Sequence, residues 1–414
     1  MNSLSLVLSA VIAVATIVAV VTQPFRIPDW VFALMGASAA LIIRLDSPIQ
    51  AWVAVRGGLD VYAFLAGIMM LAALAQHEQV FGAVADWALR TARGSSRLLF
   101  VLLFAICVVV TAMLSNDTTA VILAPVFVAV LDRSSLSAAP YLYTCAFVAN
   151  AASYVFPFSN PANLLMLAGR MPGLTSWIQA FGLSSAGAIL VTFCLLLLVF
   201  RRDLRARYSI GQRSITLSRG ALAASIGITG TFGMLIWAAM TGNSLGAVAL
   251  LGGILTCGAT LLVNHRAVAA LAAVHWGVLP LVGGLLVIVD ALDHSGALRF
   301  FAVQIAALHA HHGPLTPLAV LGIVSVAGNA LNNLPVALSV AHAFSAEPTS
   351  SRLFHAAIVG VDLGPNLLTT GSLSTLLWMR IVRSAGHTVS FRAFARVGIL
   401  VGIPALIVAG LLIQ

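Results

Sequence analysis

Two short runs of amide, hydroxyl and carboxylate side chains interrupt an otherwise apolar sequence, and such groups can bind a polar solute, a cation or a proton. The first run is residues 115–119 (SNDTT) and the second is residues 329–333 (NALNN). Lipid cannot hydrogen-bond to free backbone groups, so non-helical backbone at membrane depth survives only inside protein or beside a water-filled cavity. An acid in such a place, here Asp117, is a functional candidate by default, although one such run alone also fits a surface loop.

Two longer apolar runs are interrupted in a different way. Residues 141–168 contain FPFSNPAN, and residues 354–381 contain GVDLGPNLLTTGS. Proline removes a backbone donor and clashes with the preceding helical turn, and the exposed polar groups would have no partners in lipid. Both runs are therefore predicted to be discontinuous helices.

The composition requires a membrane around these segments. Of the 414 residues, 61% are hydrophobic and 8% are charged, against roughly 25% charged in an ordinary soluble domain. At about 20 apolar residues per span, the chain has room for about ten to twelve crossings. The first 22 residues lack a basic start and a cleavage site, so they are predicted to be a true first span.

The basic residues indicate orientation in a membrane and not a nucleic-acid partner. All 21 of them are arginines, the formal charge is +9, and most stand at the ends of apolar runs. Such arginines set orientation and meet anionic lipid. Residues 201–219 hold six arginines and are predicted to be a cytoplasmic linker. Sixteen of the 21 arginines then lie inside and five outside, namely Arg44, Arg56, Arg170, Arg299 and Arg352. Both termini are therefore predicted to be periplasmic, in a bacterial inner membrane.

The chain divides into two halves of the same order. The first half is residues 1–200, with a re-entrant hairpin at 98–131 and a broken helix at 138–170. The second is residues 220–414, with a hairpin at 316–346 and a broken helix at 352–386. Interfacial stretches are expected at 77–97, where Val80, Phe81, Val84, Trp87 and Ala88 recur at helical spacing, and at 292–312. The remaining apolar runs are predicted spans at 6–21, 30–43, 61–75, 174–200, 221–240, 245–263, 276–289 and 391–413.

The two halves also match at the level of residues. FLAGIMML at 64–71 corresponds to LVGGLLVI at 281–288, and Asn116-Asp117 corresponds to Asn332-Asn333. Paired interruptions at corresponding places in two halves are the best sequence pointer to a transporter's binding site. Five crossings and one hairpin per half make the second half enter from the opposite side. The predicted fold class is therefore an all-α polytopic membrane protein built from two inverted repeats, each with five transmembrane helices and one re-entrant hairpin.

Each predicted site contains one carboxylate, and a carboxylate removed from water is suited to carrying a proton. Asp117 lies on the first hairpin, where the second half has Asn333, and Asp362 lies on the second broken helix, where the first half has Asn150. A structural role as a neutral or paired acid is the alternative for each. Site one is predicted to combine Asn116, Asp117, Thr118, Thr119, Asn150, Ser159, Asn160 and Asn163. Site two is predicted to combine Asn329, Asn332, Asn333, Asp362, Asn366, Thr369, Thr370 and Ser372.

Other chemically capable residues are less persuasive. His309, His311 and His312 resemble a metal cluster, but they belong to a predicted outer loop without acidic partners. The four cysteines, Cys107, Cys145, Cys194 and Cys257, are scattered singly, so no disulfide framework or zinc site is indicated. No metal and no cofactor is predicted. Five acids near the ends of spans are expected to be interfacial, namely Asp60, Glu78, Asp86, Asp290 and Asp293.

With these motifs in view, the chain resembles the ion transporter superfamily and, more closely, the ArsB arsenite and antimonite efflux family. The resemblance rests on NDTTA, SNPAN and NNLP, and most specifically on GVDLGPN followed by GSLSTLLW. It implies a ten-span, two-hairpin fold that exports trivalent arsenic and antimony as neutral hydroxides in exchange for protons. It also implies optional pairing with an ArsA-type cytosolic ATPase. Several members of that family have aspartate where this chain has Asn150, which bears on the number of protons carried.

Two other functions stay open on the residues alone. A sodium/proton antiporter or a sodium-coupled carboxylate carrier of the same superfamily has related hairpin tips. No arginine lies within the predicted sites, which argues against a dianionic substrate, yet helix N-termini can bind carboxylates without arginine. An intramembrane protease or lipid transferase is the third hypothesis, and the chain has no HExxH motif to support it.

Overall fold

A computed structural model describes residues 3–131, 136–209, 217–297, 313, 315–345, 348, 351–387 and 389–414. Within these residues every regular element is a helix, apart from one isolated β-bridge between Ser95 and Arg207. Seven of the described helices are long and apolar enough to cross a membrane. The fold is therefore an all-helical polytopic membrane protein, as predicted. His309, His311, His312 and residues 210–216 of the linker lie outside the described residues.

The first half has five α-helices before its hairpin. Its elements are α1 (Ser3–Thr22), η1 (Pro24–Arg26), α2 (Asp29–Ile42), α3 (Pro48–Gly57), α4 (Leu59–His77), α5 (Val80–Thr91), α6 (Ser96–Met113), α7 (Asn116–Thr118), the π-helical turn η2 (Thr119–Leu123) and α8 (Ala124–Leu131). The broken helix is α9 (Ala139–Ala151) and α10 (Pro161–Met166), and α11 (Leu174–Val199) and the turn η3 (Asp203–Arg205) follow.

The second half repeats this order. Its elements are α12 (Arg219–Thr241), α13 (Leu245–Val263), η4 (His265–Ala267), α14 (Val268–Ala272), α15 (Val278–His294), and the hairpin helices α17 (Thr316–Leu331) and α18 (Asn333–Ala343). The second broken helix is α19 (Arg352–Leu363), η5 (Gly364–Asn366) and α20 (Leu373–Ser384), and α21 (Phe391–Leu411) ends the chain.

Small residues let helices from opposite halves approach closely. A Cβ on Gly67 of α4 would lie 2.2 Å from the Ala249 carbonyl of α13, and one on Gly284 of α15 would lie 2.7 Å from the Ala33 carbonyl of α2. Lipid gives little hydrophobic drive for association, so close van der Waals packing of small residues must hold these pairs. The α4–α13 pair and the α15–α2 pair involve corresponding helices of the two halves.

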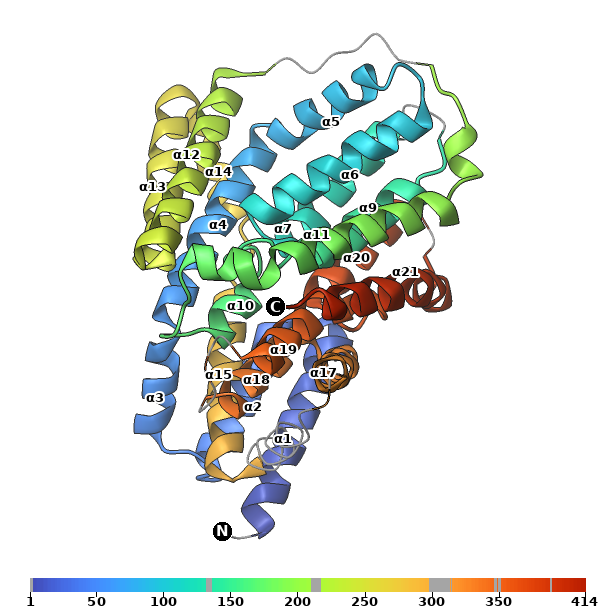
Figure 1. Cartoon of the computed structure of the whole chain (residues 1–414). Coiled ribbons are helices and arrows are strands. Elements are labelled where there is room, and N and C mark those ends of the chain that lie inside the picture. Colours follow the sequence, from blue (N-terminus) through green and yellow to red (C-terminus); the bar gives the residue numbers. More distant parts are fainter. Residues whose placement is uncertain are drawn as a thin grey trace.

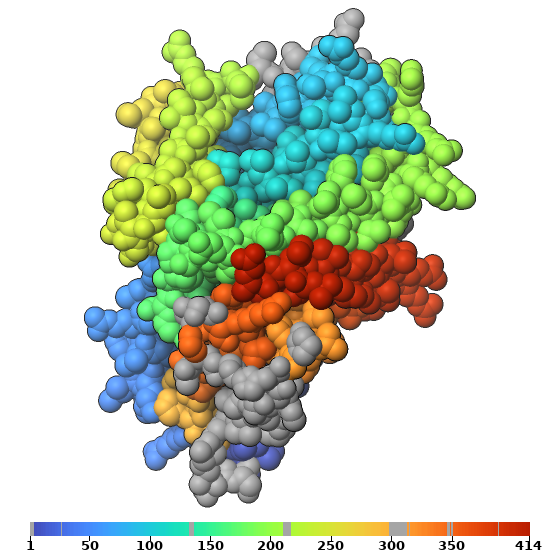
Figure 2. All heavy atoms as spheres, viewed as in Figure 1, coloured from blue at the N-terminus to red at the C-terminus, as the bar shows by residue number. Residues whose placement is uncertain are grey.

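Two helices cross the middle of the molecule. α11 and α21 lie side by side, as the ribbon and the space-filling view both show (Figures 1 and 2). Ser184 on α11 donates a hydrogen bond of 2.9 Å to the Ala409 carbonyl on α21. These helices separate the layer of α5 and α6 from the layer of α17 and α19 in this view (Figure 1).

The structure adds elements that the hydropathy pattern did not predict. Helix α3 occupies residues predicted to be a connection, and its capping box joins Ser47 and Gln50 with Pro48 at the first position. Those three residues are a sequence signal for a helix start that hydropathy alone overlooks. Helix α5 lies within the predicted interfacial stretch 77–97, and in it Val80, Phe81 and Ala88 are buried, whereas Trp87 is 55% exposed.

Candidate functional site

Each of the four interrupted helices restarts at a polar residue that caps the following segment. The Ser115 hydroxyl accepts from Thr118 N (3.2 Å) and the Asn160 amide oxygen accepts from Ala162 N (3.0 Å). In the second half, Asn332 and Ser372 do the same for Leu334 N and Thr375 N. A helix start leaves backbone donors without partners, and such side chains satisfy them. Several of the predicted site residues are therefore needed first to make the breaks possible.

Backbone hydrogen bonds dock each hairpin tip onto a broken helix. Asn116 N donates to the Ser159 carbonyl at 3.1 Å, and Asn333 N donates to the Gly371 carbonyl at 2.9 Å. Ser159 and Gly371 correspond in the two halves of the sequence. The tips thus meet the breaks at equivalent places.

Asp117 is linked to the other half of the chain. Its carboxylate accepts a hydrogen bond from the Ser374 hydroxyl, at the start of α20. Helix α20 packs against η2 and α8 of the first hairpin, which explains this contact. Asp117 is partly exposed and borders a cavity. Ser374 was not predicted as a site residue, although it belongs to the quoted GSLSTLLW motif.

Asp362 is linked to the first half in the corresponding way. Its two carboxylate oxygens accept from the side-chain amides of Asn160 and Asn163, the second at 2.9 Å, and its exposure is 0%. These asparagines stand at the start of α10, which packs against α18 of the second hairpin. Unlike Asp117, Asp362 is fully enclosed by protein.

A third contact between the halves lies among the same helices. Asn150 of α9 donates to the amide oxygen of Asn366 (3.0 Å), and Asn366 donates to the Phe147 carbonyl (3.0 Å). These hydrogen bonds join Asp362 and Asn366 of the second predicted set to residues of the first set, namely Asn150, Asn160 and Asn163. Each hairpin also packs on the second half-helix of the opposite half, so polar residues of both halves meet at the breaks.

Other predicted residues form hydrogen bonds within the interrupted segments themselves. The Thr119 hydroxyl pairs with that of Thr111 at 2.7 Å, and the Thr118 hydroxyl pairs with that of Ser115 at 3.0 Å. The Asn329 amide donates to the Gly364 carbonyl (2.8 Å) and accepts from Leu368 N (2.9 Å).

The remaining predicted residues lie beside Asn329 and its hydrogen bonds. Thr370 donates to the Asn329 carbonyl at 2.7 Å, and Thr369 is buried in the same break. Asn332 has a positive φ of 75°, a conformation rare for residues other than glycine. The second hairpin therefore turns at a single residue, which caps α18 in the same place.

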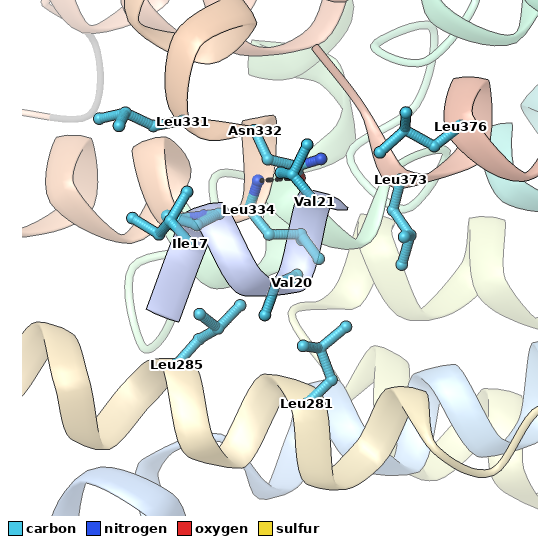
Figure 3. A pocket seen from close by; sticks show the side chains of 11 residues that line it. Ile17, Val20, Val21, Leu281, Leu285, Leu331, Asn332, Leu334, Leu373 and Leu376 are labelled. Carbon is cyan, nitrogen blue, oxygen red and sulfur yellow. Dashed lines mark hydrogen bonds between the residues drawn. The ribbon is translucent and has the colours of Figure 1, made fainter. Parts of the chain in front are cut away.

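The cavities beside the two tips differ in size. A cavity of about 110 Å³ reaches Asp117, Ser115 and Thr118 of the first tip, and Gln76 and His275 also line it. A space of about 10 Å³ lies beside Asn332 of the second tip, among leucines such as Leu331 and Leu373 (Figure 3), and a separate apolar cavity of about 360 Å³ lies along the second hairpin, lined by Leu331, Pro335 and Val336. Gln76 and His275 are exposed and were not predicted, because nothing in their sequence context marks them.

Broken helices and hairpin tips that meet around buried carboxylates inside a helical membrane protein are typical of secondary transporters. The sequence model of the citrate transporter family CitMHS matches residues 10–360, and the chain belongs to this membrane transporter family. The matching family model is thus that of a citrate transporter family and not of the arsenite efflux family that the motifs resemble.

Individual relatives have been given different names. The chain is 24% identical over 424 residues to the arsenical pump membrane protein of Escherichia coli, with 97% of each chain covered. It is 25% identical over 415 residues to an uncharacterized transporter of Mycobacterium tuberculosis, with 95% of each covered. The crystal structure of the Alcanivorax borkumensis YdaH transporter, 15% identical, covers 88% of this chain and 86% of its own with a TM-score of 0.53.

Proposed function

We propose that this transporter exports arsenite and antimonite, as neutral trihydroxides, in exchange for protons. The observation that carries the proposal is the set of partners of the two acids. Asp117 is bonded by Ser374, and Asp362 by Asn160 and Asn163, so among the described residues only neutral donors contact each carboxylate. With no fixed cation beside it, a carboxylate can gain and lose a proton as its surroundings change.

The unequal environments of the two acids support alternating access. Asp117 borders a cavity of about 110 Å³ that polar side chains line in part, whereas Asp362 is enclosed. We infer that this conformation opens the first tip to one side of the membrane and closes the second. With the linker in the cytoplasm, Gln76 near the end of α4 and His275 just before α15 lie on the cytoplasmic side, so the open side is the cytoplasm. The packing of α4 with α13 and of α15 with α2, helices at corresponding places in the two halves, supports two inverted repeats.

The lining groups fit a small neutral polyol-like solute. Hydroxyls of Ser115 and Thr118 border the cavity, and amides stand behind them. A trihydroxide both donates and accepts hydrogen bonds, as these groups do. The E. coli and Yersinia enterocolitica relatives named arsenical pump membrane protein support the same substrate.

A sodium/proton antiporter or a sodium-coupled carboxylate carrier is the second candidate. The citrate transporter description of the family favours the carboxylate carrier. The N-terminal ends of α18 and α20, close to the hairpin tips, could hold a carboxylate without arginine.

The deciding experiment measures transport in everted membrane vesicles that contain this chain. With an acid interior, arsenite is expected to accumulate, and nigericin, which collapses the proton gradient, is expected to abolish accumulation. Sodium-dependent citrate uptake with indifference to arsenite would instead establish the carboxylate carrier. Accumulation that nigericin leaves unchanged would refute proton coupling.

We further propose that the protein lies in the bacterial inner membrane with both termini in the periplasm, and that it can associate with an ArsA-type ATPase. In a variant without native cysteines, Asn243→Cys is expected to react with an impermeant maleimide on intact spheroplasts, and Arg202→Cys is not. The reverse pattern would invert the orientation. For the ATPase, co-purification from cells that express both proteins is the measurement, and its absence would remove that partner.

A further inference from the structure

Three potential metal ligands meet at a place remote from the transport network. Asp46 lies in the turn between α2 and α3, and Asp290 and His294 lie in the last turn of α15. One ligand atom from each residue lies within 4.8 Å of those of the other two. The sequence predicted Asp290 only as an interfacial acid and gave no reason to associate it with Asp46, 244 residues earlier.

The burial of Asp46 is the feature that ordinary surface acids lack. Its residue exposure is 5%, and its Oδ1 accepts from Ser47 N at 2.7 Å. Its Oδ2 is buried and has no hydrogen-bond partner, and the Oδ2 atom of Asp290 is likewise buried without a hydrogen-bond donor. Ligand oxygens of the two carboxyl groups lie within 4.8 Å of each other. Two acids placed together with buried oxygens need a positive charge or a proton between them.

The geometry of the other two groups fits a small divalent cation. Asp290 and His294 stand four residues apart on one helix face, and His294 Nδ1 lies 3.4 Å from Asp290 Oδ2. A tetrahedral zinc ion with bonds of about 2.0–2.1 Å holds its ligand atoms about 3.3–3.4 Å apart. Ligand pairs at this helical spacing are common in zinc sites.

The surroundings supply the outer contacts of such a site. His294 Nε2 lies 2.7 Å from the side-chain nitrogen of Gln50 on α3, and His294 Nδ1 lies 2.9 Å from the Asp290 carbonyl oxygen. Binding of a metal at Nδ1 therefore requires that Nδ1 give up its contact with this carbonyl and that the Gln50 amide turn so that its oxygen accepts from Nε2–H. The neighbouring Asp293 is already paired with His342 of α18 at 2.6 Å, so it is separate from the three ligands. His294 is exposed, which leaves a path for an ion from solvent.

We propose that Asp46, Asp290 and His294 bind one divalent transition-metal cation of the zinc class. Two carboxylates and one imidazole are a ligand set that suits Zn²⁺ and leave a fourth position for water. The ion would fasten the α2–α3 turn to the end of α15. Because α15 also packs against α18, the ion would fix a helix that contacts the second hairpin.

The test uses the full-length, tag-free protein in detergent, stripped with EDTA and titrated with Zn²⁺ against a chromophoric chelator. His309, His311 and His312 are replaced by glutamine in every variant, because a histidine-rich segment can bind zinc by itself. One saturable site per chain is expected. Asp46→Asn, Asp290→Asn and His294→Gln are each expected to weaken it at least 100-fold. The matched control Asp293→Asn should change affinity less than threefold.

A thermal melt gives an independent readout that does not depend on transport. Zinc is expected to raise the melting temperature of the parent and of Asp293→Asn but not of the three ligand variants, because a ligand stabilises only a state that binds it. If Asp46→Asn fails to fold, His294→Gln still tests the site, because His294 is exposed and its replacement should leave the protein folded. No saturable zinc binding by the parent, as expected if the acids merely share a proton, would overturn the proposal. So would binding that survives Asp290→Asn and His294→Gln.

Discussion

Replacing Asp362 with asparagine should uncouple transport from the proton gradient without unfolding the protein. Asp362 has no exposed surface, and it accepts one hydrogen bond from Asn160 and one from Asn163. Asparagine has nearly the same shape but cannot gain or lose a proton. If Asp362 carries a proton, the variant should still exchange arsenite across a membrane at equal pH but should not accumulate it against a gradient.

The hydrogen bonds around Asp362 set the expected change in stability. In Asp362→Asn, the new side-chain amide nitrogen would face Asn163, whose side-chain oxygen is buried without a hydrogen-bond partner. The Asn163 amide can turn to accept from it, at the loss of its 3.2 Å bond to the Ser153 carbonyl. The net loss is then one neutral hydrogen bond, about 0.5–1.5 kcal/mol. Asp362→Ala instead leaves two buried donors unpaired at about 1–3 kcal/mol each, about 2–6 kcal/mol in total.

The assay compares both variants with the parent in two measurements. Thermal unfolding in detergent should rank the parent first, Asp362→Asn close behind and Asp362→Ala last. Reconstituted vesicles should then separate arsenite exchange at equal pH from uptake driven by a pH gradient. Full gradient-driven uptake by Asp362→Asn would refute a proton-carrying role. Loss of exchange as well as uptake, in a folded variant, would assign Asp362 to substrate binding instead.

Two further predictions concern contacts between the halves. Ser374→Ala removes the side-chain donor to Asp117. It should lower gradient-driven transport about tenfold or more, since a hydrogen bond to a charged group contributes about 1.5–3 kcal/mol. Ser374→Thr keeps the hydroxyl and should retain activity, and equal transport rates in the parent and both variants would show that this contact does not matter for transport. Gly67→Ala places a Cβ 2.2 Å from backbone of α13 and should destabilise the protein by about 1–3 kcal/mol or more. Gly258→Ala, with no atom within 4 Å of its Cβ, is the matched control and should be neutral or stabilising in the same thermal melts.

Much of the fold followed from local chemistry. Long apolar runs can only be helices in lipid, and Pro161 with its polar neighbours can only mark a break there. Short elements with weaker signals were missed, as with α3, because a capping box of three residues is easily lost beside long hydrophobic runs. The exposure of Trp87 could not be predicted from helical spacing, since spacing shows which residues share one face of a helix but not which element packs against that face.

The two polar hairpin tips, SNDTT and NALNN, show which features the sequence determined and which required the tertiary structure. Sequence determined that these segments are breaks, because unpaired polar backbone and an acid cannot stand in lipid. Only the tertiary structure decided which groups meet at them. Asp117 lies 257 residues from Ser374, and Asp362 lies 202 residues from Asn160. These contacts follow from each hairpin packing on the second half-helix of the opposite repeat, and no local pattern in a sequence specifies a packing between its two halves.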